Sequence, residues 1–294
     1  GVGQRPGDSG GPPPSVGDAQ GPQFDVLVVA ERCWGSSLTR AGLEEVVAAF
    51  PSLAQGGVVI PSSVSILAQA VESVKLRDSN FLDVQKFEHE SGLNYSAYNN
   101  QAQRSRLACH LATRGCYREL CAPAEVLTFD LQGLAGARGG LGSDTTFEGL
   151  ARLGPLGEGR LDGVVTWTEV RLASGSQPLD WPPGGSCSLG TCWVYCHFPA
   201  SVRGGGAAVA PNTSIQVGFR LEHGGVWLTE PRAPGDTLGL SAYHTSMLQS
   251  DAVRTRAYRL GIERAVEQLK QRGGPDAQVR VMDIGAGTGF LSAC

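Results

Sequence analysis

The chain has 294 residues, of which 41% are hydrophobic, so it is long enough for one large globular domain or two smaller ones. Its 24 basic and 28 acidic residues give a formal net charge of -4, which excludes the strongly basic surface typical of nucleic-acid-binding proteins. A mildly acidic surface is better suited to binding a basic peptide. The sequence contains no run of 18 apolar residues, so we expect no membrane-spanning helix.

The first residues of the chain, 1–23, contain no apolar run, so we expect a disordered lead-in and not a signal peptide. Without a secretory signal the eight cysteines are expected to be reduced, in a protein of the cytoplasm or nucleus. The tightest group, Cys187, Cys192, Cys196 and His197, lacks the C-x2-C spacing of zinc sites. We therefore expect core cysteines on a strand there and no bound metal.

Residues 24–73 predict strands and a helix of an α/β domain. The run FDVLVVA at 24–30 is apolar throughout and predicts a strand buried on both faces of a parallel sheet. A helix is predicted at 38–50, where four apolar residues share one face: Leu43, Val46, Val47 and Phe50. In 56–73, Pro61 separates a short apolar strand from a second, alternating one, whose apolar positions are Val64, Ile66, Ala68 and Ala70.

The pattern then changes to that of antiparallel strands, at 125–131, 162–172, 192–198 and 214–230. The last of these is expected to fold back at His223, Gly224 and Gly225 as a hairpin, with alternate residues on one side: Ile215, Val217, Phe219 and Leu221. The glycine-rich stretches at 133–160 and 182–206 are expected to be loops. Such strands predict a β-barrel or sandwich after the parallel strands.

After Pro231 the apolar spacing becomes helical and ends near 273–275, where two glycines precede a proline. The apolar positions of this predicted helix are Val253, Ala257, Leu260, Ile262, Val266 and Leu269. A strand, VRVMDI at 279–284, and a glycine loop follow. The chain thus reads as α/β, then β, then the beginning of a second α/β unit.

The glycine loop carries Gly285, Gly287 and Gly289 between a strand and a predicted helix, where a main chain can approach a ligand closely. The spacing is not the dinucleotide G-x-G-x-x-G, and no P-loop lysine follows. By itself it is equally consistent with a strand-to-helix turn that binds nothing. Asp283, at the carboxyl end of the strand, would orient the loop around a cationic or amine-bearing ligand.

The whole string VMDIGAGTGFLS resembles motif I of the S-adenosylmethionine-dependent methyltransferases, which have a Rossmann-like fold. The resemblance implies S-adenosyl-L-methionine as cofactor. It assigns cofactor binding to five residues: Asp283, Gly285, Gly287, Thr288 and Gly289.

Residues 243–258, YHTSMLQSDAVRTRAY, narrow this to the protein arginine methyltransferases, whose N-terminal helix they resemble. By that resemblance Met247 packs near the methyl-bearing sulfur and Arg254 binds the carboxylate of the cofactor. The second role is chemically sound, because a guanidinium pairs with a carboxylate through two parallel hydrogen bonds.

Earlier segments are similar to the same family, in particular to its tandem members, known as the seventh and ninth, which carry two modules in one chain. FDVLVVAE at 24–31 resembles the strand that leads into the double-glutamate loop, and YRELCAPAEVLTFDL and VVTWTEVRL resemble barrel strands. The resemblance implies that 24–60 is the last part of a first Rossmann-like domain, 61–235 a β-barrel that binds substrate, and 236–294 the start of a second Rossmann-like domain. We therefore expect a fragment that spans a module boundary.

In this family two glutamates hold the substrate guanidinium in line with the cofactor methyl group. Glu31 matches the first, but the second is expected nine residues later, where this sequence has Arg40, with Glu44 and Glu45 beyond. An arginine there would repel a guanidinium. The T-H-W loop of the family is also missing, since SCSLGT precedes the strand at 192–198. The first module is therefore expected to be degenerate unless Glu44 or Glu45 takes the place of the second glutamate. The alternative to a catalytic Glu31 is a sheet-end carboxylate bonded to local N–H groups.

The favoured hypothesis is methyl transfer from S-adenosylmethionine to arginines in glycine-rich or basic protein segments, with the two modules pairing within one chain. A second hypothesis makes the first module a non-catalytic scaffold for protein interaction. A methyltransferase for small molecules is disfavoured, because a long β domain beside the cofactor fold suits an extended peptide. Neither nucleic acid nor membrane is an expected partner.

Overall fold

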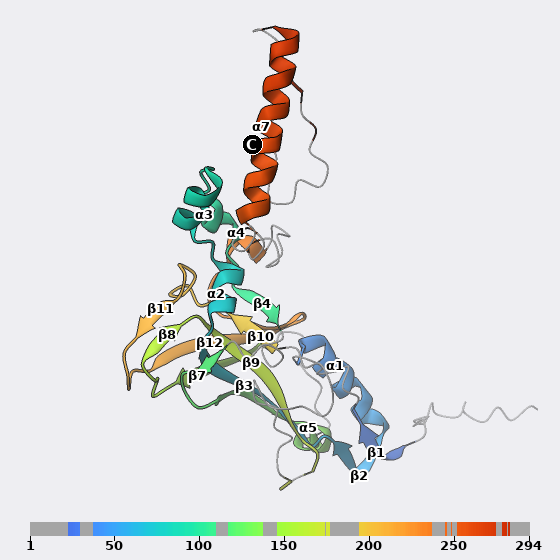
Figure 1. Ribbon diagram of the computed structural model, residues 1–294. Helices are drawn as coiled ribbons and strands as arrows, with labels where there is room; N and C mark the ends of the chain where they lie inside the picture. The colour runs from blue at the N-terminus through green and yellow to red at the C-terminus, as the bar shows by residue number, and fades with distance from the viewer. Residues whose placement is uncertain are drawn as a thin grey trace, which may run out of the picture.

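The structure is a computed structural model that describes residues 23–29, 38–109, 117–137, 146–173, 175–176, 194–236, 245, 248, 252–274, 278–280 and 282. The predicted lead-in, apart from residue 23, and the predicted glycine loop lie outside these residues. Of the strand predicted at 279–284, the described residues 279, 280 and 282 have no regular secondary structure. The described chain is a mixed α/β protein with several sheets (Figure 1).

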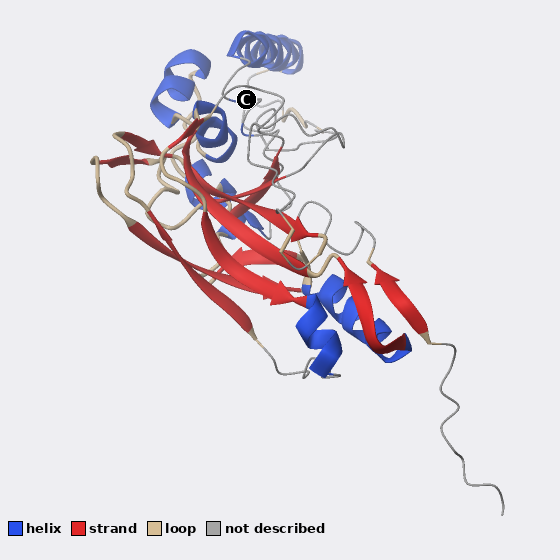
Figure 2. Cartoon of the chain, turned by 90° about the horizontal axis from the view of Figure 1, so that it is seen from below, coloured by secondary structure: helices blue, strands red, loops and turns tan. Residues whose placement is uncertain are grey.

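The first described strands form a small parallel sheet. β1 (Phe24–Val28) pairs with β2 (Leu53–Ile60), and the two lie beside helices α1 (Arg40–Ala49) and α5 (Leu131–Ala137) at one end of the molecule (Figure 2). The predicted parallel strand and helix are confirmed, and the four apolar residues predicted on one helix face are all buried. The predicted burial of β1 on both faces is wrong in the described sheet. The sheet has only two strands, and the described residues cover one of its faces and leave Val28 69% exposed on the other.

The central sheet contains six strands. β3 (Ser63–Glu72) pairs antiparallel with β9 (Gly163–Arg171), β6 (Ala124–Asp130) and β5 (Arg118–Glu119). Beyond β9 the sheet continues through β10 (Val194–His197) to β4 (Arg106–Cys109). All four apolar positions predicted for the alternating strand are at most 1% exposed. The alternation therefore placed this strand correctly.

A three-stranded antiparallel sheet lies across the central sheet. β12 (Ile215–Glu222) pairs with β7 (Phe147–Leu153) and with β13 (Gly225–Leu228), and β8 (Gly159–Leu161) forms a separate pair with β11 (Ala207–Val209). The hairpin predicted at 223–225 is confirmed. The predicted β-barrel is not closed within the described ranges, where the strands form open sheets.

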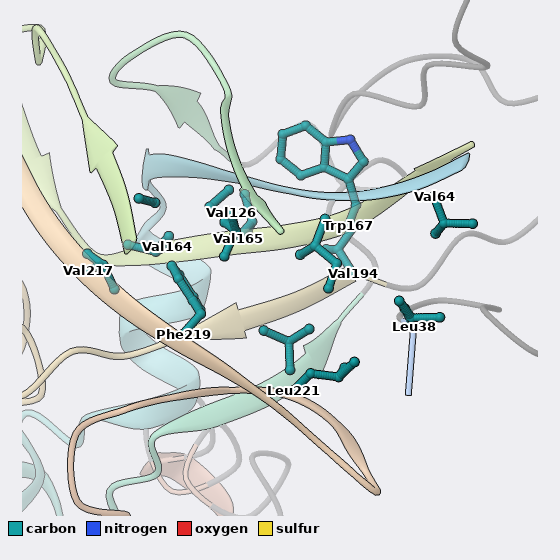
Figure 3. Packing of buried hydrophobic residues seen from close by; sticks show 14 of the residues in the cluster. Leu38, Val64, Val126, Val164, Val165, Trp167, Val194, Val217, Phe219 and Leu221 are labelled. Carbon is teal, nitrogen blue, oxygen red and sulfur yellow. The ribbon is translucent and has the colours of Figure 1, made fainter. Parts of the chain in front are cut away.

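The main core lies between these two sheets (Figure 3). Val217, Phe219 and Leu221 of β12 point toward the valines of β9 and β10, and the ring of Phe219 meets that of His197 edge to face at 5.4 Å. Burial of this many aliphatic side chains is the dominant favourable term of folding. The same core includes the apolar face of α1 and so joins the α/β end to the β domain.

Part of the predicted loop region at 133–160 forms regular structure. β7 lies within it, and α5 and β8 overlap its two ends. Its glycines serve close packing as well as turns: a Cβ at Gly149 of β7 would overlap the carbonyl oxygen of Val126. Glycine in a strand marks such close approaches of two backbones, so composition alone was misleading here.

A helical excursion leaves the sheet after β3. It contains α2 (Val74–Asn80), α3 (Val84–Ser91) and α4 (Tyr98–Ala102). Helix α3 packs against α7 (Ala252–Gly273), which lies at the opposite end of the molecule from β1 and β2 (Figure 1). A second core cluster forms here from Leu82, Phe87, Tyr98, Ala102 and Leu248. The Tyr98 and Thr245 hydroxyls are hydrogen-bonded at 3.0 Å, so segments far apart in sequence meet.

Candidate functional site

A hairpin turn forms one wall of the candidate site. β12 ends at Glu222 and β13 begins at Gly225, whose φ of 107° suits glycine. The side chain of Trp227 projects from β13 on the strand position paired with Arg220. The turn therefore places an aromatic ring, a guanidinium and a carboxylate close together.

A cation from the neighbouring sheet braces this turn. Arg106, on β4, donates to the carbonyl oxygen of Gly224 at 3.1 Å and to that of Val226 at 2.9 Å. Its guanidinium also lies 4.3 Å from the ring centroid of Tyr195 and 3.9 Å from that of Trp227, within the range of cation–π attraction. Burial lowers the pKa of Arg106 below its usual value, although a guanidinium stays protonated at neutral pH.

The opposite wall comes from the beginning of α1. Thr39 caps this helix by accepting a hydrogen bond from the backbone N–H of Gly42 at 2.9 Å. Arg40 is the first helical residue, and its Nε lies 2.7 Å from Oε1 of Glu44, one turn later. Glu44, one of the two carboxylates predicted to replace a glutamate at position 40, is therefore already paired with Arg40.

Between the two walls lies an open pocket with a volume of about 530 Å³, which we call the arginine pocket. It is lined by Arg40, Thr146, Arg220, Leu221, Glu222, His223, Gly224, Trp227 and Arg232. Three guanidinium groups thus face one carboxylate on the lining. A cavity of this size is typical of sites for small ligands or single side chains.

The one lining carboxylate, that of Glu222, is shared by two cations. Its Oε1 lies 2.8 Å from a terminal nitrogen of Arg220, and its Oε2 is paired with Arg232. The guanidinium of Arg232 also lies 4.2 Å from the ring centroid of Trp227. Trp227 is therefore in contact with two cations. Each lining arginine already has a carboxylate beside it, since Arg40 is paired with Glu44 and Arg220 also lies 4.0 Å from Glu148.

Most of the residues predicted to bind the cofactor lie outside the described part of the chain. This applies to Met247 and to the five motif I residues from 283 to 289, and also to Glu31, the predicted catalytic residue. Arg254 is described and lies exposed on the first turn of α7. These assignments remain predictions.

Cys196 and His197 do not form a metal site. They are neighbours on β10, so their side chains leave opposite faces of the sheet, and Nε2 of His197 is 2.8 Å from the hydroxyl oxygen of Thr166. Within the described ranges, no group of three histidine, cysteine or acidic residues is arranged to hold a metal ion. Cys187 and Cys192, the other members of the predicted group, lie outside the described residues.

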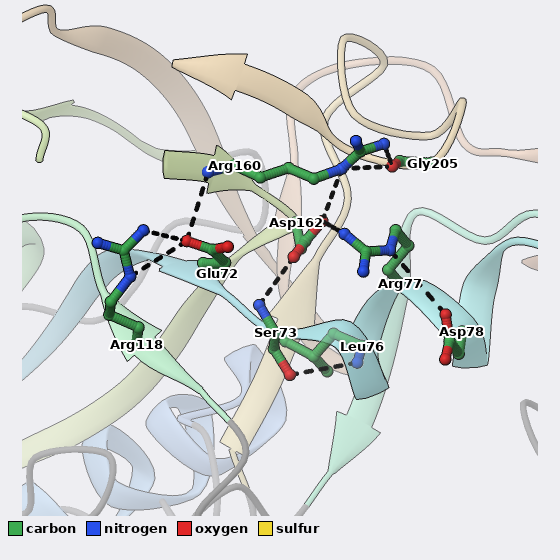
Figure 4. Close-up of polar contacts among 9 residues, drawn as sticks. All are labelled: Glu72, Ser73, Leu76, Arg77, Asp78, Arg118, Arg160, Asp162 and Gly205. Atoms are coloured by element: carbon green, nitrogen blue, oxygen red, sulfur yellow. Dashed lines mark hydrogen bonds and ion pairs between the residues drawn. The ribbon is translucent and has the colours of Figure 1, made fainter. Parts of the chain in front are cut away.

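A second ionic cluster, at the base of the helical excursion, is structural (Figure 4). The buried carboxylate of Asp162 accepts from the backbone N–H of Ser73 at 2.8 Å and pairs with Arg77 at 3.3 Å and Arg160 at 3.5 Å. Burial raises the pKa of Asp162, and these partners oppose the rise. Because the carboxylate is fully used in joining β3, β8 and α2, it offers no open position to a ligand.

No protein-family model matches the chain, and no curated protein matches it. Among solved structures it is similar to a chain of the Trypanosoma brucei PRMT1 enzyme–prozyme heterotetrameric complex with AdoHcy, with 16% identity and a TM-score of 0.49. The match covers 67% of this chain and 59% of that one, so this chain spans about three fifths of its neighbour's length. A likeness of this size leaves the function to be argued from the residues of this chain.

None of the helices in the described ranges is both long and apolar enough to cross a lipid bilayer.

Sequence reasoning found Arg40 but missed its partners in the pocket. Arg220 and Arg232 are separated from it by almost the whole β domain, and each alone is an ordinary strand or loop arginine. The local signal was the concentration of arginine, glutamate, histidine and tryptophan around one hairpin turn, in RLEHGGVWLTEPR at 220–232. Only the packing of α1 against β12 shows that Arg40 belongs to the same site.

Proposed function

We propose that the chain takes part in S-adenosylmethionine-dependent methylation of arginine side chains in proteins. The observation that carries the proposal is the string VMDIGAGTGFLS, preceded by YHTSMLQSDAVRTRAY, at the spacing of an N-terminal helix and motif I. The proposed cofactor-binding residues are Met247, Arg254, Asp283, Gly285, Gly287, Thr288 and Gly289. The proposed substrates are arginines in glycine-rich or basic protein segments, and the proposed location of the chain is the cytoplasm or the nucleus.

The geometry of α7 supports this proposal. The helix runs from Ala252 to Gly273 and is followed by Gly274, whose φ of 86° ends it before the proposed motif I strand. Arg254 on the first helical turn is exposed. A guanidinium in this position can make a bidentate pair with the carboxylate of an amino-acid cofactor.

We further propose that the first module, 24–235, has a non-catalytic role beside the cofactor-binding segment. The arginine pocket favours this role, because Arg40 stands where a substrate-binding glutamate is expected and Glu44, which could have replaced that glutamate, is paired with Arg40. The contact of Tyr98 with Thr245 links the helical excursion of this module to the segment before α7. This contact supports pairing of the two modules within one chain.

The first test is calorimetric titration of S-adenosylmethionine, and of its demethylated product, into the chain. We expect binding that is lost in Arg254→Ala and in Asp283→Ala, because each removes a charged partner of the ligand. Arg256→Ala is the matched control, since Arg256 is exposed on the same helix, and it should bind as the parent does. Absence of binding by the parent chain, or equal loss in the control, would contradict cofactor binding by these residues.

Turnover is tested separately, by transfer of a labelled methyl group to a peptide of alternating arginine and glycine. Labelling of the peptide that requires Asp283 supports methyl transfer by this chain. Binding of the peptide to a chain that holds the cofactor, without labelling, supports the non-catalytic role instead.

A further inference from the structure

The tripeptide Arg-Gly-Gly occurs three times in the sequence, beginning at Arg138, Arg203 and Arg272. An arginine followed by glycines is the kind of segment that the proposed function names as its substrate, so each of the three is a candidate acceptor within the chain itself. Arg138 lies outside the described residues. The structure distinguishes the other two by the surroundings of their guanidinium groups.

Arg203 is held in place by its own fold. Its Nε donates to the carbonyl oxygen of Phe198 at 2.9 Å, and a terminal nitrogen donates to that of Pro231 at 3.1 Å. The carboxylate of Glu230 lies 3.7 Å away, and only 15% of the Arg203 side chain is exposed. A guanidinium with these partners cannot enter the site of an enzyme while the chain remains folded.

Arg272 lies in different surroundings. It is exposed in the last turn of α7, and no hydrogen bond or ion pair in the described part of the chain engages its guanidinium. Gly273 ends the helix, and Gly274 follows it with a φ of 86°. Helix ends fray, and glycine lets another surface approach the backbone closely, so both the side chain and the main chain are accessible here.

The length of α7 decides between transfer within one molecule and transfer between two. Arg254, the proposed partner of the cofactor carboxylate, lies near the other end of the same helix. A helix rises about 1.5 Å per residue, which separates the two arginines by about 27 Å along its axis. An arginine side chain is much shorter than that, so Arg272 cannot meet a cofactor held by Arg254 of the same molecule. The methyl donor must therefore be bound by a second copy of the chain.

We propose that Arg272 is a methylation site of this chain, modified by a second copy of it. The inference rests on the proposed function, because it needs methyl transfer from S-adenosylmethionine. A nitrogen of the Arg272 guanidinium forms a bond to the methyl carbon, and the bond from this carbon to sulfur breaks. The electron pair of that bond stays on the sulfur of the demethylated product, and the nitrogen releases one proton to water.

The test is incubation of the full chain with S-adenosylmethionine that carries a labelled methyl group, followed by mass spectrometry to locate the label. We expect label at Arg272 and its loss in Arg272→Lys, because an ammonium group keeps the charge but presents no guanidinium. Arg203→Lys should keep the label. So should Arg152→Lys, since Arg152 is exposed but lies on β7, which is paired with β12, and is not followed by glycine.

A mixture of two variants tests transfer between molecules. Arg272→Lys keeps the proposed cofactor-binding residues and Asp283→Ala keeps the acceptor, so the mixture should label the Asp283→Ala chain, although neither variant alone becomes labelled at Arg272. Phenylglyoxal, which modifies guanidinium groups, supplies a measurement that does not depend on activity. It should react faster with Arg272 than with Arg203 in the folded chain.

The arginine–glycine peptide described above, added to a parallel reaction, separates this inference from the proposed function. Label on the peptide but not on the chain overturns methylation of Arg272 and leaves the proposed function standing, whereas label on neither overturns both. Label at Arg138 or Arg203 in place of Arg272, or equal reaction of Arg203 and Arg272 with phenylglyoxal, would also overturn the inference. So would a mixture of the two variants that stays unlabelled.

Discussion

Replacing Arg106 tests whether one cation holds the hairpin turn in place. Arg106→Ala removes the hydrogen bonds to the carbonyl oxygens of Gly224 and Val226 and the contacts with the rings of Tyr195 and Trp227. Hydrogen bonds from a charged donor contribute about 1.5–3 kcal/mol and each cation–π contact about 0.5–1 kcal/mol. Because Arg106 is only half buried and Gly224 is exposed to water, we expect a loss of about 2–4 kcal/mol in the free energy of unfolding.

The assay is denaturant unfolding, supported by thermal melting, in which the midpoint should fall by about 5–15 °C. Arg106→Lys should lose at least half as much unfolding free energy as Arg106→Ala. An ammonium group keeps the charge, but it neither stacks as a plane on the aromatic rings nor donates to two carbonyl oxygens in a fork. Arg152→Ala is the control, and we expect it to change stability by less than about 0.5 kcal/mol. If both Arg106 variants unfold as the control does, the turn is held by its own glycines and the reasoning is wrong.

Two further predictions concern the buried core. Burial, and next the Arg106 cation, lower the pKa of His197 to about 3, so between about pH 6.5 and 3 the unfolded chain takes up a proton that the folded chain does not. The free energy of unfolding should therefore fall by about 1.4 kcal/mol per pH unit well below pH 6.5. Unfolding measured across that pH range should show a smaller fall in His197→Gln. An unchanged slope in His197→Gln would contradict this. Gly149→Ala should destabilise the folded chain by several kcal/mol, because the added Cβ overlaps the backbone of β6. Gly136→Ala in α5, where a Cβ meets open space, should stabilise it by up to about 1 kcal/mol. Equal melting temperatures of the two variants would refute the packing argument.

The elements that were predicted correctly have strong internal patterns. The alternation through β3, the hairpin at 223–225 and the apolar face of α1 each repeat over several residues, so each could be recognised locally. The short helices of the excursion were not predicted, because α2 and α4 have only seven and five residues and depend on contacts elsewhere for their stability. β5, with two residues, is defined by its pairing to β3 alone.

The arginine pocket shows why a site is harder to predict than a strand. The sequence shows Arg40 in place of an expected glutamate only when it is compared with the family it resembles. The effect of that arginine on the site depends on which side chains lie opposite it. Those side chains, Arg220 and Arg232, come from a distant hairpin, and no spacing rule connects them to α1. The exposure of β1 was missed for a related reason, since an apolar run predicts a buried strand without showing what covers it.

The hydrogen bond between Tyr98 and Thr245 joins residues 147 positions apart, and this separation has a consequence for synthesis of the chain. On a ribosome the excursion emerges long before the segment that covers Tyr98 and Phe87. At about 5–20 residues per second, the wait is about 7–30 s. During that time an apolar helical surface is without its partner, which makes it a natural target for chaperones that bind nascent chains.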